Sequence, residues 1–314
     1  MTTDTATATT SSVNATAQFY QRSTGVRLFR TALTSAQSLW PTLAERMAKR
    51  LFLTPLPPKW LQRNSAWAVQ WHIERWAFER ASVTVYRHQN SAACDAHAEE
   101  ASTRPHVLLM HGWGGHAAQM LPLADALVEQ GMVPVIIEAP GHGRSAGNTA
   151  TLPQFARAME YVAARLREQG VSLHAIIAHS LGGSAGARVV ARGLPTQGLV
   201  LIAAPDAPRD YTRMFAQVFG LSEPTRAAMQ RRIEAQEGML MEQFDAAQSA
   251  PNVQVPTLVV HDVNDAINGF AGAERFMRYL PHARLLRTEG LGHRKILKDA
   301  ETHAQIVKFL MRLV

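Results

Sequence analysis

Cysteine and long apolar runs are the two features that this sequence most clearly lacks. It contains one cysteine, Cys94, which excludes an internal disulfide and gives no cysteine pattern for a zinc site. No stretch approaches the roughly twenty apolar residues that a membrane-spanning helix needs. Residues 1–19 are mostly Thr, Ala and Ser, without the basic start and apolar run of a secretory signal. We therefore expect a cytoplasmic protein whose N-terminus is a disordered tail or, alternatively, an organellar transit peptide.

The sequence also lacks the patterns of nucleotide, nucleic-acid and metal sites. Neither G-x-G-x-x-G nor G-x-x-x-x-G-K-S occurs, so no nucleotide cofactor is implied. The net charge of +7 lies mostly in residues 1–80, which hold ten Lys or Arg against four Asp or Glu, but these cations stand singly between apolar residues. That scatter is not typical of a nucleic-acid-binding module. The thirteen histidines lack the i, i+4 pairing and acidic neighbours of a metal site, so no metal is expected either.

Two amphipathic helices are predicted near the N-terminus, followed by a linker. Apolar residues recur at helical spacing from Val26 to Leu39 and from Leu43 to Leu51, and Pro41 opens the second helix. "LTPLPP", residues 53–58, breaks the pattern. Five of the six tryptophans lie between residues 40 and 76, so this region should pack against a large apolar surface. That surface is the protein's own core or, alternatively, a membrane or a dimer partner.

From residue 82 onward, short apolar strands alternate with helices. Continuous apolarity in the strands predicts burial on both faces, as in a parallel sheet covered by helices. The predicted strands span residues 82–88, 106–112, 133–139, 173–179, 199–204, 256–262 and 283–290. The predicted helices lie near residues 117–130, 153–168, 183–193, 271–280 and 300–313. The alternation predicts a doubly wound, mostly parallel α/β fold.

Residues 206–250 interrupt this alternation and are too long for a simple crossover. They predict a helical insertion, one helix of which is opened by "SEPT", with Ser222 as N-cap and Pro224 in the first turn. We expect a lid over the carboxyl ends of the strands, where open α/β sheets bind ligands. Its Met and Phe residues suggest an apolar acyl or alcohol group. The expected organisation is a tail and helical arm in 1–58 and an α/β domain in 59–314, with 206–250 as the lid.

Ser180, in the stretch "AHSLGG" (178–183), is the candidate nucleophile. It follows a buried strand and precedes a helix, which is the setting of a nucleophile elbow. The strained turn of such an elbow needs small residues two positions away on each side, and Ala178 and Gly182 meet that need. The backbone N–H of Leu181 is one candidate oxyanion donor, and that of Trp113, in the glycine-rich turn "HGWGG" (111–115), is the second.

An acid and a base follow the serine in the order that a catalytic triad requires. Asp265 lies in "HDVNDAIN" (261–268) and His293 in "GLGHRKIL" (289–296), each just after a predicted strand. Asp262 and Asp206 are alternatives for the acid. We expect Asp262 to be a turn or cap residue instead. His111, His142 and His179 are expected to be structural neighbours of these turns.

Five motifs together make the chain from about residue 66 to its end resemble the α/β-hydrolase-fold serine hydrolases. They are "HGWGG", "PGHGRS" (140–145), "AHSLGG", "HDVND" and "GLGH", in the family's order and at family-like spacing. The resemblance implies Ser180 as nucleophile, His293 as general base, Asp265 as acid, and Trp113 with Leu181 as oxyanion hole. It does not cover the N-terminal arm.

The activity expected from these residues is hydrolysis of a carboxylic ester of an apolar small molecule through an acyl-enzyme. The same fold and triad could instead cleave a C–C bond, an amide or a thioester. A non-catalytic binding protein is the alternative from a different class. No cofactor is expected, and peripheral membrane contact or a homodimer through the arm is the alternative to packing of the arm on the protein's own core.

Overall fold

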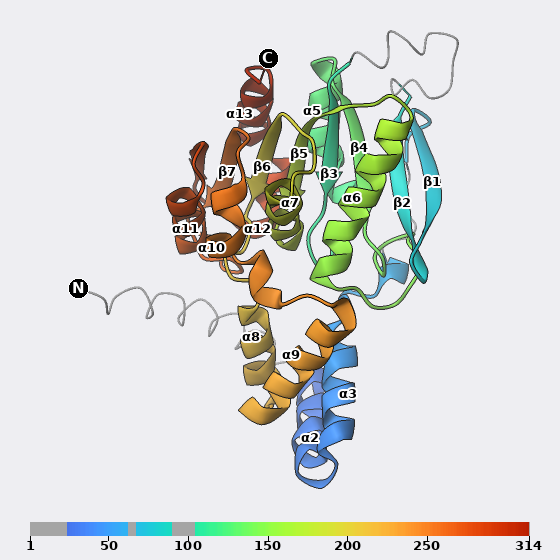
Figure 1. The fold of residues 1–314 in the computed structure, drawn as a ribbon, viewed down its shortest axis with the longest axis vertical. Helices are drawn as coiled ribbons and strands as arrows, with labels where there is room; N and C mark the ends of the chain where they lie inside the picture. The colour runs from blue at the N-terminus through green and yellow to red at the C-terminus, as the bar shows by residue number, and fades with distance from the viewer. Residues whose placement is uncertain (1–23, 62–66, 90–103, 314) are drawn as a thin grey trace, which may run out of the picture.

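The molecule is built around one eight-stranded sheet, shown in Figure 1. The structure, a computed structural model, describes residues 24–61, 67–89 and 104–313, so the expected tail lies outside the described residues. The strand order is β1-β2-β4-β3-β5-β6-β7-β8. The strands are β1 Trp71–Phe78, β2 Ala81–His88, β3 His106–Met110, β4 Val133–Glu138, β5 Leu173–His179, β6 Gly198–Ile202, β7 Thr257–Asp262 and β8 Ala283–Thr288.

The mostly parallel α/β fold that the sequence predicts is confirmed. Strands β3 to β8 are parallel, whereas β2 pairs antiparallel with both β1 and β4. Strand β1 was not predicted, because this edge strand carries exposed charged residues where a buried strand is apolar. Strand β8 was predicted as a buried apolar strand, yet its residues are half-buried or exposed because it has a neighbour on one side only.

Helices cover both faces of the sheet, as Figure 1 shows. Helices α6 (Leu152–Glu168), α7 (Leu181–Ala191) and α11 (Ala271–Tyr279) pack on one face. Helices α5 (Leu121–Glu129) and α13 (Ala300–Leu310) pack on the other. The short helices are α10 Ala246–Ser249 and α12 Gly292–Lys295, with 3-10 turns η1 Lys59–Leu61, η2 Ala117–Met120, η3 Met241–Phe244, η4 Ala250–Asn252 and η5 Ile296–Lys298. No helix in the described ranges is long and apolar enough to cross a bilayer.

The insertion and the N-terminal arm form a separate helical layer in the lower half of Figure 1. The arm consists of α2 (Thr24–Leu39) and α3 (Pro41–Phe52), and the insertion contributes α8 (Asp210–Phe219) and α9 (Glu223–Glu237). Ser222 caps α9 and a proline lies in its first turn, as predicted. These four helices share an apolar cluster of their own, which consists of Leu33, Ala48, Leu53, Phe215, Met229 and Ile233.

This cluster changes how the composition of the insertion is interpreted. Phe215, Phe219, Met229 and Met241, which suggested an apolar substrate, pack against the arm instead. The sequence alone suggests a substrate contact for these residues because it does not show that the arm, far upstream, is their packing partner. The arm likewise covers apolar surface of its own chain, although Trp40 at its tip is exposed.

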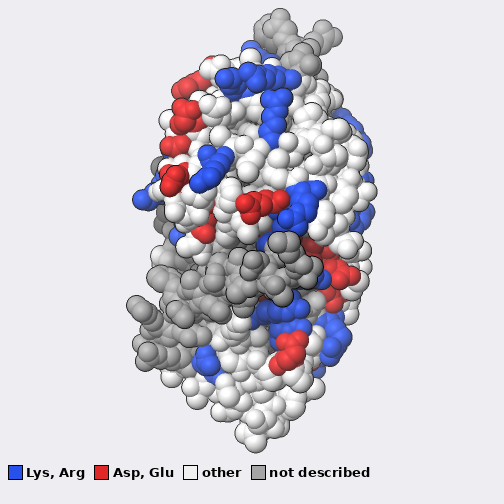
Figure 2. Space-filling view, turned by 90° about the vertical axis from the view of Figure 1, so that its left-hand side faces the viewer, with Lys and Arg blue, Asp and Glu red and all other residues white. Residues whose placement is uncertain are grey.

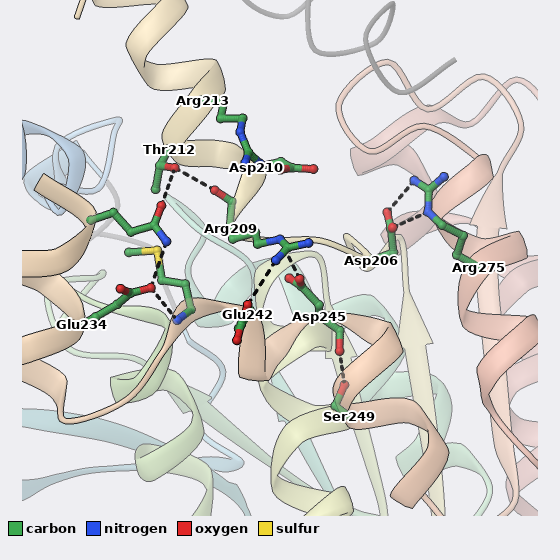
Figure 3. A network of polar contacts seen from close by, with 12 residues as sticks. Asp206, Arg209, Asp210, Thr212, Arg213, Glu234, Glu242, Asp245, Ser249 and Arg275 are labelled. Carbon is green, nitrogen blue, oxygen red and sulfur yellow. Dashed lines mark hydrogen bonds and ion pairs between the residues drawn. The ribbon is translucent and has the colours of Figure 1, made fainter. Parts of the chain in front are cut away.

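Ion pairs hold the base of the insertion, as Figure 3 shows. Asp206, at its start, forms an ion pair with Arg275 of α11 through two hydrogen bonds. Arg209 lies 2.8 Å from Asp245 and 3.4 Å from Glu242. Burial raises the pKa of Asp245 to about 7, although the charge of Arg209 opposes that shift. The start and the end of the insertion are thus tied to each other and to the core.

The shared cluster of arm and insertion predicts a measurable contribution to stability. Met229 is completely buried in it, so Met229→Ala should lower the free energy of unfolding by about 2 to 5 kcal/mol in chemical denaturation. Met311→Ala is the matched control, because that side chain is 54% exposed and its loss should change little. Equal effects of the two substitutions would show that the cluster does not stabilise the fold.

Candidate active site

Ser180 occupies a strained turn between β5 and α7. Its backbone has φ +53° and ψ −126°, a region that costs a non-glycine residue about 1 to 3 kcal/mol. The turn leaves no room for side chains beside it. A Cβ on Gly182 would lie 2.5 Å from the carbonyl oxygen of His111, and one on Gly183 would lie 2.6 Å from the Cβ of Ala204. The local sequence therefore permits a turn that holds one hydroxyl at the carboxyl end of the sheet.

The structure brings Ser180, His293 and Asp265 together in one chain of hydrogen bonds. The Oγ of Ser180 lies 3.0 Å from Nε2 of His293, and Nδ1 of His293 lies 2.7 Å from Oδ2 of Asp265. With the ring proton on Nδ1, the imidazole donates to the carboxylate and accepts from the hydroxyl. The three residues are 85 and 28 positions apart in the sequence, yet each follows a strand that ends at the same edge of the sheet. This geometry allows proton transfer from the hydroxyl to the imidazole.

Asp265 is held as a carboxylate. Burial alone would raise its pKa, but hydrogen bonds from His293 and from the backbone N–H groups of Asn268 and Ile267 outweigh burial and lower the pKa. Its Oδ1 accepts from these two N–H groups at 2.9 and 2.8 Å, which leaves Oδ2 for the imidazole. A charged, immobilised carboxylate orients the ring and stabilises the imidazolium form.

The two alternative acids have other partners. Asp262 accepts hydrogen bonds from the hydroxyl of Thr288 at 2.8 Å and from the N–H groups of Leu291 at 3.0 Å and Asn264 at 2.9 Å. It therefore braces the loop that carries His293, in keeping with its expected turn role. Asp206 lies in the ion pair with Arg275 and makes no hydrogen bond with His293.

The glycine-rich turn after β3 lies directly against Ser180. A Cβ on Gly112 would lie 2.7 Å from the Cβ of Ser180, so only glycine fits there. Trp113 follows in that turn, and Leu181 is the first residue of α7. Neither backbone N–H has a hydrogen-bond partner among the described residues. A free backbone N–H in this turn and another directly after the serine are donors of the kind that an oxyanion hole requires.

Glu138 holds this turn in place, a role that no motif in the sequence indicates. Its carboxylate is buried and accepts from the N–H of Ala117 at 3.0 Å, the N–H of Arg144 at 2.6 Å and the hydroxyl of Tyr86 at 2.9 Å. Gly143, in "PGHGRS", has φ +42°, and a Cβ there would lie 2.1 Å from this carboxyl group. The buried carboxyl group of Glu138 thus explains the glycine of that motif, whereas the sequence pattern predicts for Glu138 only a place near the end of a strand.

Histidines brace the same turns, as expected. The ring of His111 lies 2.7 Å from the carbonyl of Gly112 and accepts from the N–H of Ala139, and His142 accepts from the N–H of Gly114. His179 lies beside the elbow with Nε2 2.9 Å from the carbonyl oxygen of His293. Burial and the neighbouring His293 lower the pKa of His179 to about 3, so this ring stays neutral and donates to that carbonyl.

No group of three or more His, Cys, Asp or Glu side chains could hold a metal ion in the part of the chain that the structure describes. The residues near Ser180 are instead a hydroxyl, an imidazole, a carboxylate and backbone N–H groups. Such a set performs nucleophilic acyl transfer with protein groups alone.

Comparison with known families agrees with this chemistry. The family model described as serine aminopeptidase S33 matches residues 101–244, and the model described as TAP-like protein matches residues 240–312. Pimeloyl-[acyl-carrier protein] methyl ester esterase of Xanthomonas oryzae pv. oryzae is 26% identical over 256 residues, which cover 67% of this chain and 95% of that protein.

Solved structures share the fold. Est1E from Butyrivibrio proteoclasticus has a TM-score of 0.58 at 14% identity and covers 77% of this chain and 98% of its own. A membrane phospholipase A, described as a bacterial virulence factor, has a TM-score of 0.54 at 17% identity and covers 92% of this chain and 97% of its own. The resemblance that the five motifs indicate is confirmed: the chain has the α/β-hydrolase fold and is similar to proteins of the esterase and lipase type.

Proposed function

We propose that this protein hydrolyses a carboxylic ester of an apolar small molecule through an acyl-enzyme on Ser180. The observation that carries the proposal is the continuous hydrogen-bond chain from Ser180 through His293 to Asp265. The esterases and lipases among its relatives support ester hydrolysis as the reaction. The ring of Trp113, packed beside Phe155 next to the oxyanion turn, supports an apolar group in the substrate.

In the proposed mechanism, His293 accepts and then donates one proton in each of two half-reactions. His293 removes the proton of the Ser180 hydroxyl as its oxygen attacks the ester carbonyl, and Asp265 stabilises the imidazolium. The N–H groups of Trp113 and Leu181 bind the oxyanion, each contributing about 3 to 4 kcal/mol. The imidazolium then protonates the departing alcohol and leaves an ester of Ser180. Water, deprotonated by His293, attacks that ester, and the acid is released as Ser180 regains its proton.

Removal of the nucleophile is the first test. Ser180→Ala should lower kcat for a p-nitrophenyl ester by a factor on the order of 10⁶, because the covalent step is lost. Ser184→Ala is the matched control, since this serine lies on the same helix and its hydroxyl donates to the carbonyl of Pro205. A fluorophosphonate probe should label the wild type and the control variant but not Ser180→Ala. Undiminished turnover by Ser180→Ala would rule out Ser180 as the nucleophile, whereas a wild type with neither turnover nor labelling would favour a non-catalytic binding protein.

The identity of the acid is tested by a second pair of variants. Asp265→Asn should lower kcat by about 10⁴-fold, because an amide in place of the carboxylate favours the wrong imidazole tautomer. Asp206→Asn, the alternative acid, should keep most of the activity. The assignment is wrong if the two effects on kcat are exchanged.

The type of bond that the enzyme cleaves is tested with a panel of substrates. One matching family is described as serine aminopeptidase, so amides belong in the substrate panel beside esters, thioesters and activated C–C bonds. We expect kcat/KM to be highest for esters with apolar acyl or alcohol groups. A preference for aminoacyl amides would replace the ester proposal with a peptidase.

We also propose that the tip of the arm contacts a membrane surface. Leu39, Trp40 and Leu43 are exposed together where α2 turns into α3, at the lower end of Figure 1. An exposed tryptophan with aliphatic neighbours suits the interface of a bilayer, and the net positive charge of residues 1–80 suits anionic lipids. The structural relative that covers 92% of this chain is named a membrane phospholipase A. A cytoplasmic location remains our prediction from the single cysteine.

This contact is tested with vesicles. Trp40→Ala combined with Leu43→Ala should reduce co-sedimentation with anionic vesicles several-fold, because about 25 cal/mol is lost per Å² of apolar surface no longer buried in lipid. Trp60→Ala is the control, since Trp60 is similarly exposed but lies outside the arm. If the arm forms a homodimer instead, the double variant halves the molecular mass in solution and leaves vesicle binding unchanged.

A further inference from the structure

A basic cavity lies where the arm, the insertion and the start of α6 meet. Its volume is about 330 Å³. Four lining side chains are cationic, with Arg46, Lys49 and Arg50 contributed by α3 and Arg232 by α9, and none of the lining residues is acidic. The cavity includes neither Ser180 nor any other residue of the proposed catalytic set.

Few of these charges are neutralised by the protein. Arg232 forms an ion pair with Glu45 of α3, and Lys49 donates to the side-chain oxygen of Gln236 at 2.6 Å. Arg46 and Arg50 have no hydrogen bond or ion pair from their guanidinium groups among the residues that the structure describes. Because Glu45 neutralises one of the four cations, a net charge of three positive charges remains around the cavity.

The spacing of the cations makes this arrangement unfavourable for the protein alone. Arg46, Lys49 and Arg50 stand at i, i+3 and i+4 on one face of α3, where like charges repel by a few tenths of a kcal/mol per pair, about 0.2 to 0.5. The C-terminal end of the helix dipole favours Lys49 and Arg50 in the last turn, whereas Arg46 lies before that turn and Arg232 is held beside α3 by its ion pair with Glu45. By contrast, basic side chains are interspersed with acidic ones over the face shown in Figure 2.

The remaining lining groups suit the oxygens of an anion. Thr149 and Thr151 line the cavity beside the cations. The hydroxyl of Thr151 accepts from the N–H of Gln154 in the capping box of α6, so its own proton is available to an acceptor. Two free guanidinium groups and adjacent hydroxyls are the donors that recognise the several oxygens of a phosphate group.

We infer that this cavity binds a phosphate group at the junction of α3, α9 and the start of α6. The group is carried either by a soluble phosphate compound or by the headgroup of an anionic phospholipid. Binding there joins the arm, the insertion and the core around one anion. The inference goes beyond the proposed ester hydrolysis and does not depend on it.

The test compares full-length wild type with Arg46→Gln/Arg50→Gln. The midpoint of thermal unfolding is measured over a series of inorganic phosphate concentrations, at an ionic strength kept constant with chloride. A ligand that binds only the native state raises this midpoint. We expect a rise for the wild type and for the control Arg278→Gln, whose exposed arginine lies on α11, and an apparent Kd weaker by about tenfold or more for the double variant. Both altered side chains of that variant are exposed, so the native far-ultraviolet circular dichroism should be kept.

Vesicles separate the two sources of phosphate. Phosphatidylcholine vesicles with and without phosphatidic acid are sedimented with each protein. Retention by phosphatidic acid that the double variant loses identifies a lipid headgroup, whereas stabilisation by inorganic phosphate without such retention identifies a soluble compound. The inference is overturned if phosphate stabilises the wild type and the double variant equally, or if neither phosphate nor phosphatidic acid distinguishes the two proteins.

Discussion

The turn at Ser180 is the constraint on which the site depends. A residue with positive φ between a buried strand and a helix is tolerated only where no neighbouring side chain intrudes, and Gly112, Gly182 and Gly183 leave that space. The same close approach brings the turn after β3 against the serine. The strained backbone of Ser180 therefore depends on three glycines around it. The same arrangement positions the two backbone N–H groups beside the serine.

Buried polar groups on two sides keep the loops around that turn in position. Glu138 holds the segment after β3 through the N–H of Ala117 and the "PGHGRS" loop through the N–H of Arg144, and it also accepts from the hydroxyl of Tyr86 on β2. Asp262 and His179 hold the loop that carries His293, the first through its carboxylate and the second through the backbone carbonyl of His293 itself. A site whose donors are fixed before the substrate arrives does not have to reorganise in the transition state.

The core of the fold was predictable because its strands are continuous apolar runs and the helices between them have apolar residues at helical spacing. Strands β3 to β7 and the helices between them lie close to where the patterns put them, and the elbow at Ser180 follows from its small neighbours. Strand β1 could not be found in this way because its pattern mixes charged and apolar residues.

Long-range partners were beyond sequence reasoning. Nothing local in the sequence shows that Glu138 is buried beside Tyr86, 52 positions away, or that the Phe and Met residues of the insertion face the arm rather than a substrate. The residues of the arm and the insertion that make these contacts are about 160 or more positions apart in the sequence, and only the folded chain brings them together.

The apolar cluster shared by α2, α3, α8 and α9 also governs how the insertion can move. An insertion with an apolar core of its own could move as a rigid body about its two connecting segments. Here the insertion shares its apolar core with the arm. The arm is in turn connected to the α/β core by the hydrogen bond from the N–H of Ala150 to the carbonyl of Leu53. Any displacement of the insertion would have to carry all four helices as one body, so a ligand or surface that holds the arm also restrains the insertion.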